Sequence, residues 1–255
     1  MVSACMQLTA PDTLGEVLAG DDVAQLIINA LEAAEIQLQS GDVVVIAQKI
    51  ISKAEGRYRY LDQVKPGQQA RMLAPECDKD PRLVQLILDE SEEVLRVRKG
   101  VIVVQHKLGY VHANAGIDRS NLPPDRRERV LLLPKNPDAS SEAIRQRLDR
   151  HFAVQSAVII NDSAGRAWRN GTCGFAIGTA GFEPLVDLVG QKDRHGRVME
   201  VTQVAVADEL AAAASVLMGQ ADESRPVVVI RGARVKQGSY LSTSLIRDKQ
   251  SDLFR

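Results

Sequence analysis

The chain alternates short apolar runs with segments whose apolar positions recur at helical spacing. Val43–Ala47 is a run of β-branched residues after Gly41 and Asp42, which is typical of a buried strand. Before it, apolar positions from Val23 to Ala34 repeat with helical period, and Asp21 or Asp22 can cap that segment. The pattern predicts a helix followed by a central strand.

The same signals continue through the middle of the chain. A helix is predicted to begin at about Pro81 and to run through Val94. Val101–Val104 predicts a strand that turns back into Tyr110–His112 as a hairpin. Residues 114–121 are small and polar, so a loop is expected there.

The second half begins with a loop that carries Pro123 and Pro124, after which Ser140 or Ser141 can cap another helix. Three more elements are predicted, namely a strand at Ala157–Ile160 that ends at Asn161–Ser163, a helix at Thr202–Met218 and a central strand at Val227–Ile230. Helices and strands mixed with a hairpin indicate an α+β or mixed α/β fold. Residues 1–255 are expected to form one module, with two subdomains as an alternative.

Composition narrows the class of protein. The 255 residues carry 32 basic and 33 acidic side chains, so the chain lacks the excess of basic residues that is typical of nucleic-acid-binding proteins. Cys5, Cys77 and Cys173 are few and far apart, which is typical of a reducing compartment. No signal peptide or membrane-spanning run is visible, and a cytoplasmic protein without a membrane or nucleic-acid partner is expected.

Two aspartates are candidates for metal binding. Asp118 lies in a loop just after the predicted hairpin, and Asp162 directly follows an apolar strand and precedes Ser163. Carboxylates beside a hydroxyl are ligands that a hard divalent cation prefers. The alternative is that both aspartates cap turns, where Asp is a favoured residue.

Basic residues suggest where anions could bind. Lys53 and Arg57 flank a glycine after the strand and could cradle phosphates, although a solvated lysine is the alternative. Arg166 and Arg169 bracket Trp168, so they could meet an anionic substrate or pack on the ring. A set of glycines further along suggests close backbone approach or tight turns, namely Gly171, Gly174, Gly178 and Gly181.

The familiar nucleotide and hydrolase motifs are missing. The chain has neither a Walker-type phosphate loop nor a dinucleotide-binding glycine motif. The histidines show no paired ligand spacing, and each is expected to be a surface or packing residue: His106, His112, His151 and His195.

Several motifs together resemble one family, the coenzyme F420-0:γ-glutamyl ligases. They run in order along nearly the whole chain: Gly20–Asp22, Ile51–Arg57, Asn114–Asn121, Asp162–Arg169, Ala176–Gly178, Gly190–Gly196, Ala207–Ala211, Met218–Gly219 and Asp252–Arg255. The resemblance implies a fold specific to this family and an intertwined homodimer. It also implies GTP as nucleotide, Mg²⁺ or Mn²⁺ with K⁺, and the substrates F420-0 and L-glutamate.

The resemblance also assigns roles to residues. Asp118 and Asp162 are expected to bind one metal ion, with Ser163 and Gln220 at a second. The expected catalytic side chains are Asp118, Asp162 and Arg166. The nucleotide is expected to contact Ser52, Lys53, Asn121 and the loop from Met218 to Glu223, including Gly219 and Gln220. Arg166 and Arg169 are candidates for the acidic tail of the acceptor or for glutamate.

The implied reaction activates the terminal carboxylate of F420-0 as an acyl phosphate, which the amine of glutamate then attacks. Bringing these anions together requires positive charge, and Lys53 and metal ions would supply it. Two other functions remain open at this point. One is an amide ligase of the same fold with another acceptor or amino acid, and the other is a non-catalytic nucleotide-binding protein.

Overall fold

A five-stranded mixed sheet forms the centre of the computed structural model, which describes residues 4–12, 14–122 and 125–253. Its strands lie in the order β1 (Gln7–Thr9), β12 (Val227–Arg231), β2 (Val43–Ala47), β8 (Ala157–Arg166) and β9 (Arg169–Ala180). Only β2 and β8 pair in parallel, and the other neighbours are antiparallel. The β-branched residues of β2 are buried because helices cover both faces of the sheet.

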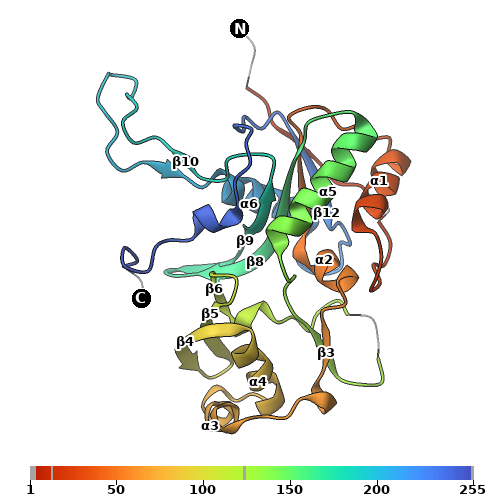
Figure 1. Cartoon of the computed structure of the whole chain (residues 1–255), viewed down its shortest axis with the longest axis vertical. Helices are drawn as coiled ribbons and strands as arrows, with labels where there is room; N and C mark the ends of the chain where they lie inside the picture. Colours follow the sequence, from red (N-terminus) through yellow and green to blue (C-terminus); the bar gives the residue numbers. More distant parts are fainter. Residues whose placement is uncertain (1–3, 13, 123–124, 254–255) are drawn as a thin grey trace.

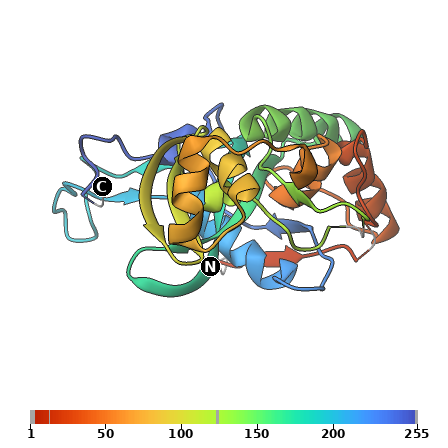
Figure 2. The same ribbon diagram turned by 90° about the horizontal axis from the view of Figure 1, so that it is seen from below.

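Helices flank this sheet on both sides. Three pack on one face: α1 (Val23–Ala33), α2 (Gln48–Ala54) and α5 (Pro137–Phe152). On the opposite face lies α6 (Val206–Met218). It packs against Val43 and Val45 of β2, because every second side chain of a strand points to the same face. Figures 1 and 2 show α5 and α6 on opposite sides of the sheet. The result is a three-layer arrangement with two separate apolar cores.

A second part of the chain, from β3 to β7, forms what we name the small region. Its elements are β3 (Tyr58–Tyr60), η1 (Leu61–Gln63), α3 (Gln68–Cys77), α4 (Pro81–Asp89), β4 (Ser91–Arg98), β5 (Val101–His106), β6 (Val111–Ala113), η2 (Asn114–Gly116) and β7 (Arg129–Leu131). β4, β5 and β6 form a three-stranded sheet, and β3 pairs with β7. The small region has an apolar core of its own and lies at the lower end of the molecule in Figure 1.

The remaining elements extend from the body. β10 (Val186–Asp187) and β11 (Gln203–Val204) form the base of an arm that projects away from the sheet in both views. The far end of the β8–β9 hairpin also extends beyond the body, and η3 (Ser242–Leu245) precedes the last described residues. None of the helices in the described ranges has the length and apolar character to span a membrane.

Several predictions from the sequence are confirmed. The fold is mixed α+β, and α1 begins at Val23 with Asp22 as its cap, whose side chain accepts from the backbone N–H of Gln25. β2 has the predicted bounds, and β5 and β6 form the predicted hairpin. The strand predicted at Val227–Ile230 lies inside the sheet between β1 and β2.

Other boundaries were wrong. The helix that begins at Pro81 ends at Asp89, and Val94 lies in β4 because it pairs with Val104 of β5. Asn136 caps α5 in place of Ser140 or Ser141, since its side chain accepts from the N–H of Ala139.

The last helix starts at Val206, four residues later than predicted. The prolines Pro123 and Pro124 of a predicted loop, and the motif residues Phe254 and Arg255, lie outside the described residues.

Gly174 and Gly178, two of the glycines singled out in the sequence, lie in β9 where a helix packs closely against it. A Cβ atom at Gly178 would come within 2.6 Å of the carbonyl of Pro137 at the start of α5. At Gly174 it would come within 2.5 Å of the carbonyl oxygen of Ala211 in α6. These glycines let a helix pack closely against each face of β9.

Candidate functional site

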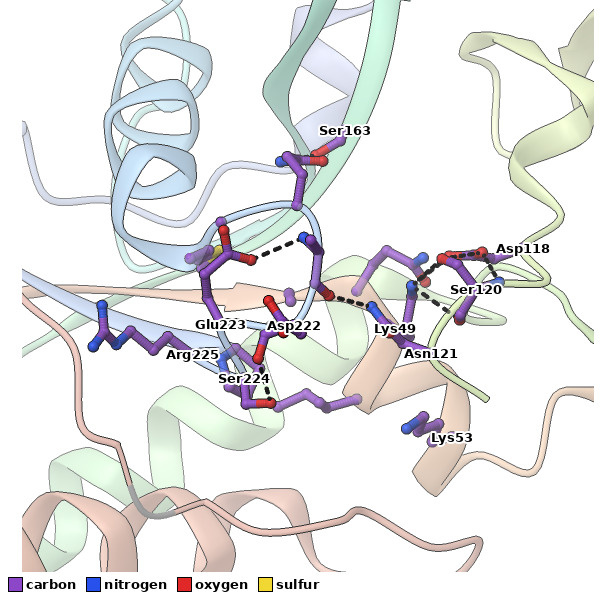
Figure 3. A pocket seen from close by; sticks show the side chains of 18 of the residues that line it. Lys49, Lys53, Asp118, Ser120, Asn121, Ser163, Asp222, Glu223, Ser224 and Arg225 are labelled. Carbon is purple, nitrogen blue, oxygen red and sulfur yellow. Dashed lines mark hydrogen bonds and ion pairs between the residues drawn. The ribbon is translucent and has the colours of Figure 1, made fainter. Parts of the chain in front are cut away.

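A pocket of about 640 Å³ opens at the end of β2, beside residues 161–163 in the middle of β8. Because these strands are parallel and Ala47 pairs with Asn161, the start of α2 and Asp162 lie at the same edge of the sheet. A loop from the small region and the segment after α6 complete the wall (Figure 3). The polar side chains that line it are Glu16, Gln48, Lys49, Lys53, Asp118, Ser120, Asn121, Asn161, Asp162, Ser163, Thr172, Gln220, Asp222, Glu223, Ser224 and Arg225.

Helix α2 presents two lysines to this pocket. Lys49 and Lys53 are four residues apart, so they lie on one face of the helix. The ammonium group of Lys49 contacts a carboxylate oxygen of Asp118 at 2.7 Å and also donates to the hydroxyl of Ser120. Lys53 is only 7% exposed, and its ammonium lies 2.6 Å from a carboxylate oxygen of Glu16. The alternative of a solvated Lys53 is therefore wrong.

Asp118 lies on the loop that follows η2. One oxygen of its carboxylate accepts from the backbone N–H and the hydroxyl of Ser120, at 2.7 and 2.8 Å. Burial raises the pKa of Asp118, but the bonds and charge from Lys49 and Ser120 outweigh burial, so the pKa is lowered. Asp118 thus caps a turn and also offers an ionised carboxylate to the pocket.

Asp162 lies inside β8, not after the end of a strand as predicted. β8 continues to Arg166 because β9 pairs with it along its whole length. One carboxylate oxygen of Asp162 accepts from the backbone N–H of Ser163 at 2.8 Å. The other lies 3.0 Å from Nε2 of His112, which reaches it from β6 of the small region. The turn-cap alternative is wrong at this position.

The contact with Asp162 also affects the histidine. Burial is the largest effect on the pKa of His112 and lowers it. The hydrogen bond and the charge of Asp162 together outweigh burial, so the pKa of His112 is raised.

The segment after α6 is held against the two walls. Gly219 has a φ of 73° and a ψ of −177°, a conformation that glycine adopts far more readily than other residues. The amide of Asn121 donates to the carbonyl of Ala221 at 2.8 Å. The amide of Gln220 donates to the hydroxyl of Ser163 at 3.0 Å. Two residues expected at the nucleotide thus tie this segment to the rest of the pocket.

The chemistry of the donors fits a hard divalent cation. Asp118, Asp162, Ser163 and Gln220 all offer oxygen atoms to one pocket, and Mg²⁺ is commonly held by one or two carboxylates together with substrate phosphates and water. Each carboxylate already has a partner, namely Lys49 for Asp118 and His112 for Asp162. Within the described ranges, no three His, Cys, Asp or Glu side chains cluster as a metal site.

The pocket brings together most of the residues expected from the sequence. Those that line it are Lys53, Asp118, Asn121, Asp162, Ser163, Met218, Gly219 and Gln220. Ser52 does not line the pocket, since it is fully buried in α2 and donates to the side chain of Gln48. Arg57 is also directed elsewhere, because it pairs with Glu90 at 2.6 Å.

Arg166 and Arg169 lie at the exposed end of the β8–β9 hairpin, outside the pocket. Arg166 donates to the carbonyl of Gly171, and Trp168 between them is 88% exposed. The structure therefore separates these arginines from the carboxylates and lysines of the pocket.

Three residues of the site were missed in the sequence. Lys49 could have been found from its spacing to Lys53, had Gln48–Ala54 been interpreted as a helix. Ser120 lies in a quoted motif, but no role was assigned to it. His112 was expected to be a surface or packing residue, and its contact with Asp162 joins positions 50 residues apart, which no local pattern predicts.

Comparison with known proteins gives the family. A family model described as F420-0:Gamma-glutamyl ligase matches residues 13–232. The chain belongs to the F420-0:gamma-glutamyl ligase family. It is therefore a ligase, and the resemblance seen in its motifs is confirmed.

Individual relatives in this family match over most of their length. The coenzyme F420:L-glutamate ligase of Methanocaldococcus jannaschii is 45% identical over 222 residues, which cover 87% of this chain and 88% of the relative. The protein of the same name from Methanothermobacter thermautotrophicus is 45% identical over 93% of this chain and 94% of its own length. The one from Haloarcula marismortui is 41% identical over 98% and 96%.

Proposed function

We propose that this member of the family uses GTP to join L-glutamate, in gamma linkage, to coenzyme F420-0. The observation that carries the proposal is one pocket whose lining includes Lys49 and Lys53, the carboxylates of Asp118 and Asp162, and the hydroxyl of Ser163. Such a set can hold a nucleoside triphosphate and neutralise the charge that develops in phosphoryl transfer. The names of the relatives support glutamate and an F420 acceptor.

In this proposal the lysines bind the phosphates of GTP and the carboxylates bind the metal ion. Lys49 and Lys53 exchange their present carboxylate partners, Asp118 and Glu16, for phosphate oxygens of GTP. Asp118 and Asp162 would then hold Mg²⁺ or Mn²⁺, with Ser163 and Gln220 nearby. The bound metal would polarise the phosphate and shield the negative charges of the reactants from one another.

The chemistry proceeds in two steps. A carboxylate oxygen of F420-0 attacks the γ-phosphorus of GTP, and the bond to the bridging oxygen breaks to release GDP. The amine of glutamate then attacks the acyl carbon, phosphate leaves with that carboxylate oxygen, and the amine loses a proton. Neither step needs a nucleophile from the protein, which is consistent with a pocket lined by charge-neutralising and positioning groups.

The proposal includes a homodimer and a cytoplasmic setting. Two parts of the chain support the dimer because they project from the body, namely the β10–β11 arm and the end of the β8–β9 hairpin. Trp168 and Val201 on them are 88% and 86% exposed. Light scattering should give twice the mass of one chain, and the mass of a single chain would contradict the dimer.

The reaction is tested by incubating the purified chain with F420-0, L-glutamate, GTP, Mn²⁺ and K⁺. Mass spectrometry should detect glutamylated product and an equal amount of GDP. Omitting each component in turn tests the nucleotide, the divalent metal and K⁺ separately. Nucleotide binding without product would point to a different acceptor or amino acid, and failure to bind GTP would contradict the proposed site.

A further inference from the structure

His112 lies directly behind one of the pocket's carboxylates without lining the pocket itself. It belongs to β6 of the small region, is only 8% exposed and places Nε2 3.0 Å from Oδ2 of Asp162. Asp162 belongs to β8 of the central sheet and does line the pocket. The contact therefore joins the two parts of the molecule behind the site.

This contact completes a two-point support of the Asp162 carboxylate. The backbone N–H of Ser163 donates to Oδ1 at 2.8 Å, and the histidine ring contacts Oδ2. A carboxylate oxygen can accept two hydrogen bonds. Each oxygen thus keeps one acceptor site, while rotation of the carboxylate is opposed from both sides.

The ring of His112 is itself held in place. Its Nδ1 lies 3.0 Å from the carbonyl oxygen of Ala113, and its centroid lies 5.7 Å from that of Phe175 on β9. The carbonyl and the carboxylate can only accept, so the ring donates wherever it makes these bonds. Partners of this kind behind a metal ligand orient the ligand, and their loss commonly weakens metal binding.

We propose that His112 is a positioning residue that orients the Asp162 carboxylate for a divalent cation. The proposal rests on the metal site of the proposed function. It assigns the small region two contributions to that site, namely Asp118 as a donor and His112 as a support. A side chain that only packs the two regions together would affect stability but not the affinity for metal.

The test is a titration of the full chain with Mn²⁺, without nucleotide, followed by the paramagnetic resonance signal of free Mn²⁺. His112→Asn keeps a polar side chain but is too short to reach Asp162, and it should weaken Mn²⁺ binding by about tenfold or more. His112→Gln places an amide N–H near the position of Nε2 and should recover most of the affinity. Melting temperatures identify any variant that fails to fold.

His106 provides the matched control. It is buried on β5 of the same small sheet, and its Nε2 lies 3.8 Å from Glu90 and away from the pocket. His106→Gln should leave Mn²⁺ affinity unchanged even if it lowers the melting temperature. An equal loss of affinity in this variant would contradict a specific role for His112.

The variant Asp162→Asn distinguishes failure of the proposed metal site from failure of the positioning role of His112. If this variant binds Mn²⁺ as the original chain does, the metal site of the proposed function fails. If it loses affinity while His112→Asn keeps or gains affinity, the metal site stands and the positioning role is overturned. Equal losses in folded His112→Asn and His112→Gln would also overturn it, because the correctly placed donor would not rescue binding.

Discussion

The central sheet and the small region each contribute one carboxylate to the pocket, and they do so in different ways. Asp162 lies within β8, a strand paired on both sides and packed between helices. Asp118 lies on a loop after η2. Each carboxylate is held by the other part of the chain, since His112 of the small region contacts Asp162 and Lys49 of α2 contacts Asp118.

Because each part supplies the partner of the other part's carboxylate, the site depends on how the central sheet and the small region pack together. Neither the central sheet nor the small region alone holds a complete set of donors and cationic partners. The central sheet gives rigidity through its buried core, while the loop with Asp118 is aligned by polar contacts. Substitutions in the two parts should therefore have different consequences.

The largest expected effect is the loss of turnover in Asp162→Asn. The substitution keeps the shape of the side chain but removes the charge that would hold a divalent cation, so kcat should fall by about a hundredfold or more. The melting temperature should stay nearly unchanged. Asp187→Asn, on the exposed arm, is the control and should remain active. Full activity in Asp162→Asn would remove the proposed metal site.

A purely structural effect is expected in the central sheet at Gly178. An alanine Cβ would lie 2.6 Å from the carbonyl of Pro137, so Gly178→Ala should lower the free energy of unfolding by about 1–3 kcal/mol. Gly165→Ala in the neighbouring strand is the control, because no atom lies within 4 Å of the added Cβ. Denaturant unfolding measures both, and equal stabilities would contradict the close packing of α5 on β9.

A smaller effect is expected from Lys53, whose carboxylate partner is Glu16. Lys53→Ala should raise the apparent KM for GTP by about tenfold, because a charge-assisted hydrogen bond to phosphate is lost. Steady-state kinetics at saturating glutamate and F420-0 measure this constant. Lys99→Ala is the control, since Lys99 is exposed and does not line the pocket. An unaltered constant in Lys53→Ala would exclude contact with the nucleotide.

The smallest effect concerns the ion pair between Glu90 and Arg57. Burial raises the pKa of Glu90, but the neighbouring ring of His106 and the charge of Arg57 outweigh burial and lower it. Glu90 therefore stabilises the fold above its ordinary pKa of 4.5, and this contribution is lost as the pH falls through the lowered value.

Glu90→Gln should accordingly lower stability by about 1 kcal/mol at neutral pH. The difference between the variant and the original chain should disappear in acid. Unfolding curves measured at neutral pH and in acid, below the lowered pKa of Glu90, test this. A difference in the free energy of unfolding that persists unchanged in acid would contradict the role of the ionised carboxylate.

The central sheet was easier to predict than the small region. β2 and α1 could be recognised because β-branched runs, helical spacing and an aspartate cap act locally. The extension of β8 through Asp162 was missed because its Asp-Ser-Ala-Gly-Arg sequence has no strand pattern and is extended by pairing with β9. Val94 was assigned to a helix because its pairing partner Val104 lies beyond the local window.

The same distinction applies to the site. Asp118, Asp162 and Lys53 could be selected as charged residues near predicted strand ends or loops, and they line one pocket. The contacts of Lys49 with Asp118 and of His112 with Asp162 arise only when the two parts dock. Arg166 could not be separated from the pocket residues by sequence, because only the length of the β8–β9 hairpin carries it away.

The most direct test of the proposed reaction follows one oxygen atom. F420-0 labelled with a heavy oxygen isotope in its reacting carboxylate is incubated with the chain, GTP, L-glutamate and Mn²⁺, and the released phosphate is analysed by mass spectrometry. Attack of the carboxylate on the γ-phosphorus predicts that each phosphate carries one labelled oxygen for each amide formed. Amide product with unlabelled phosphate would contradict an acyl-phosphate intermediate and the role assigned to this pocket.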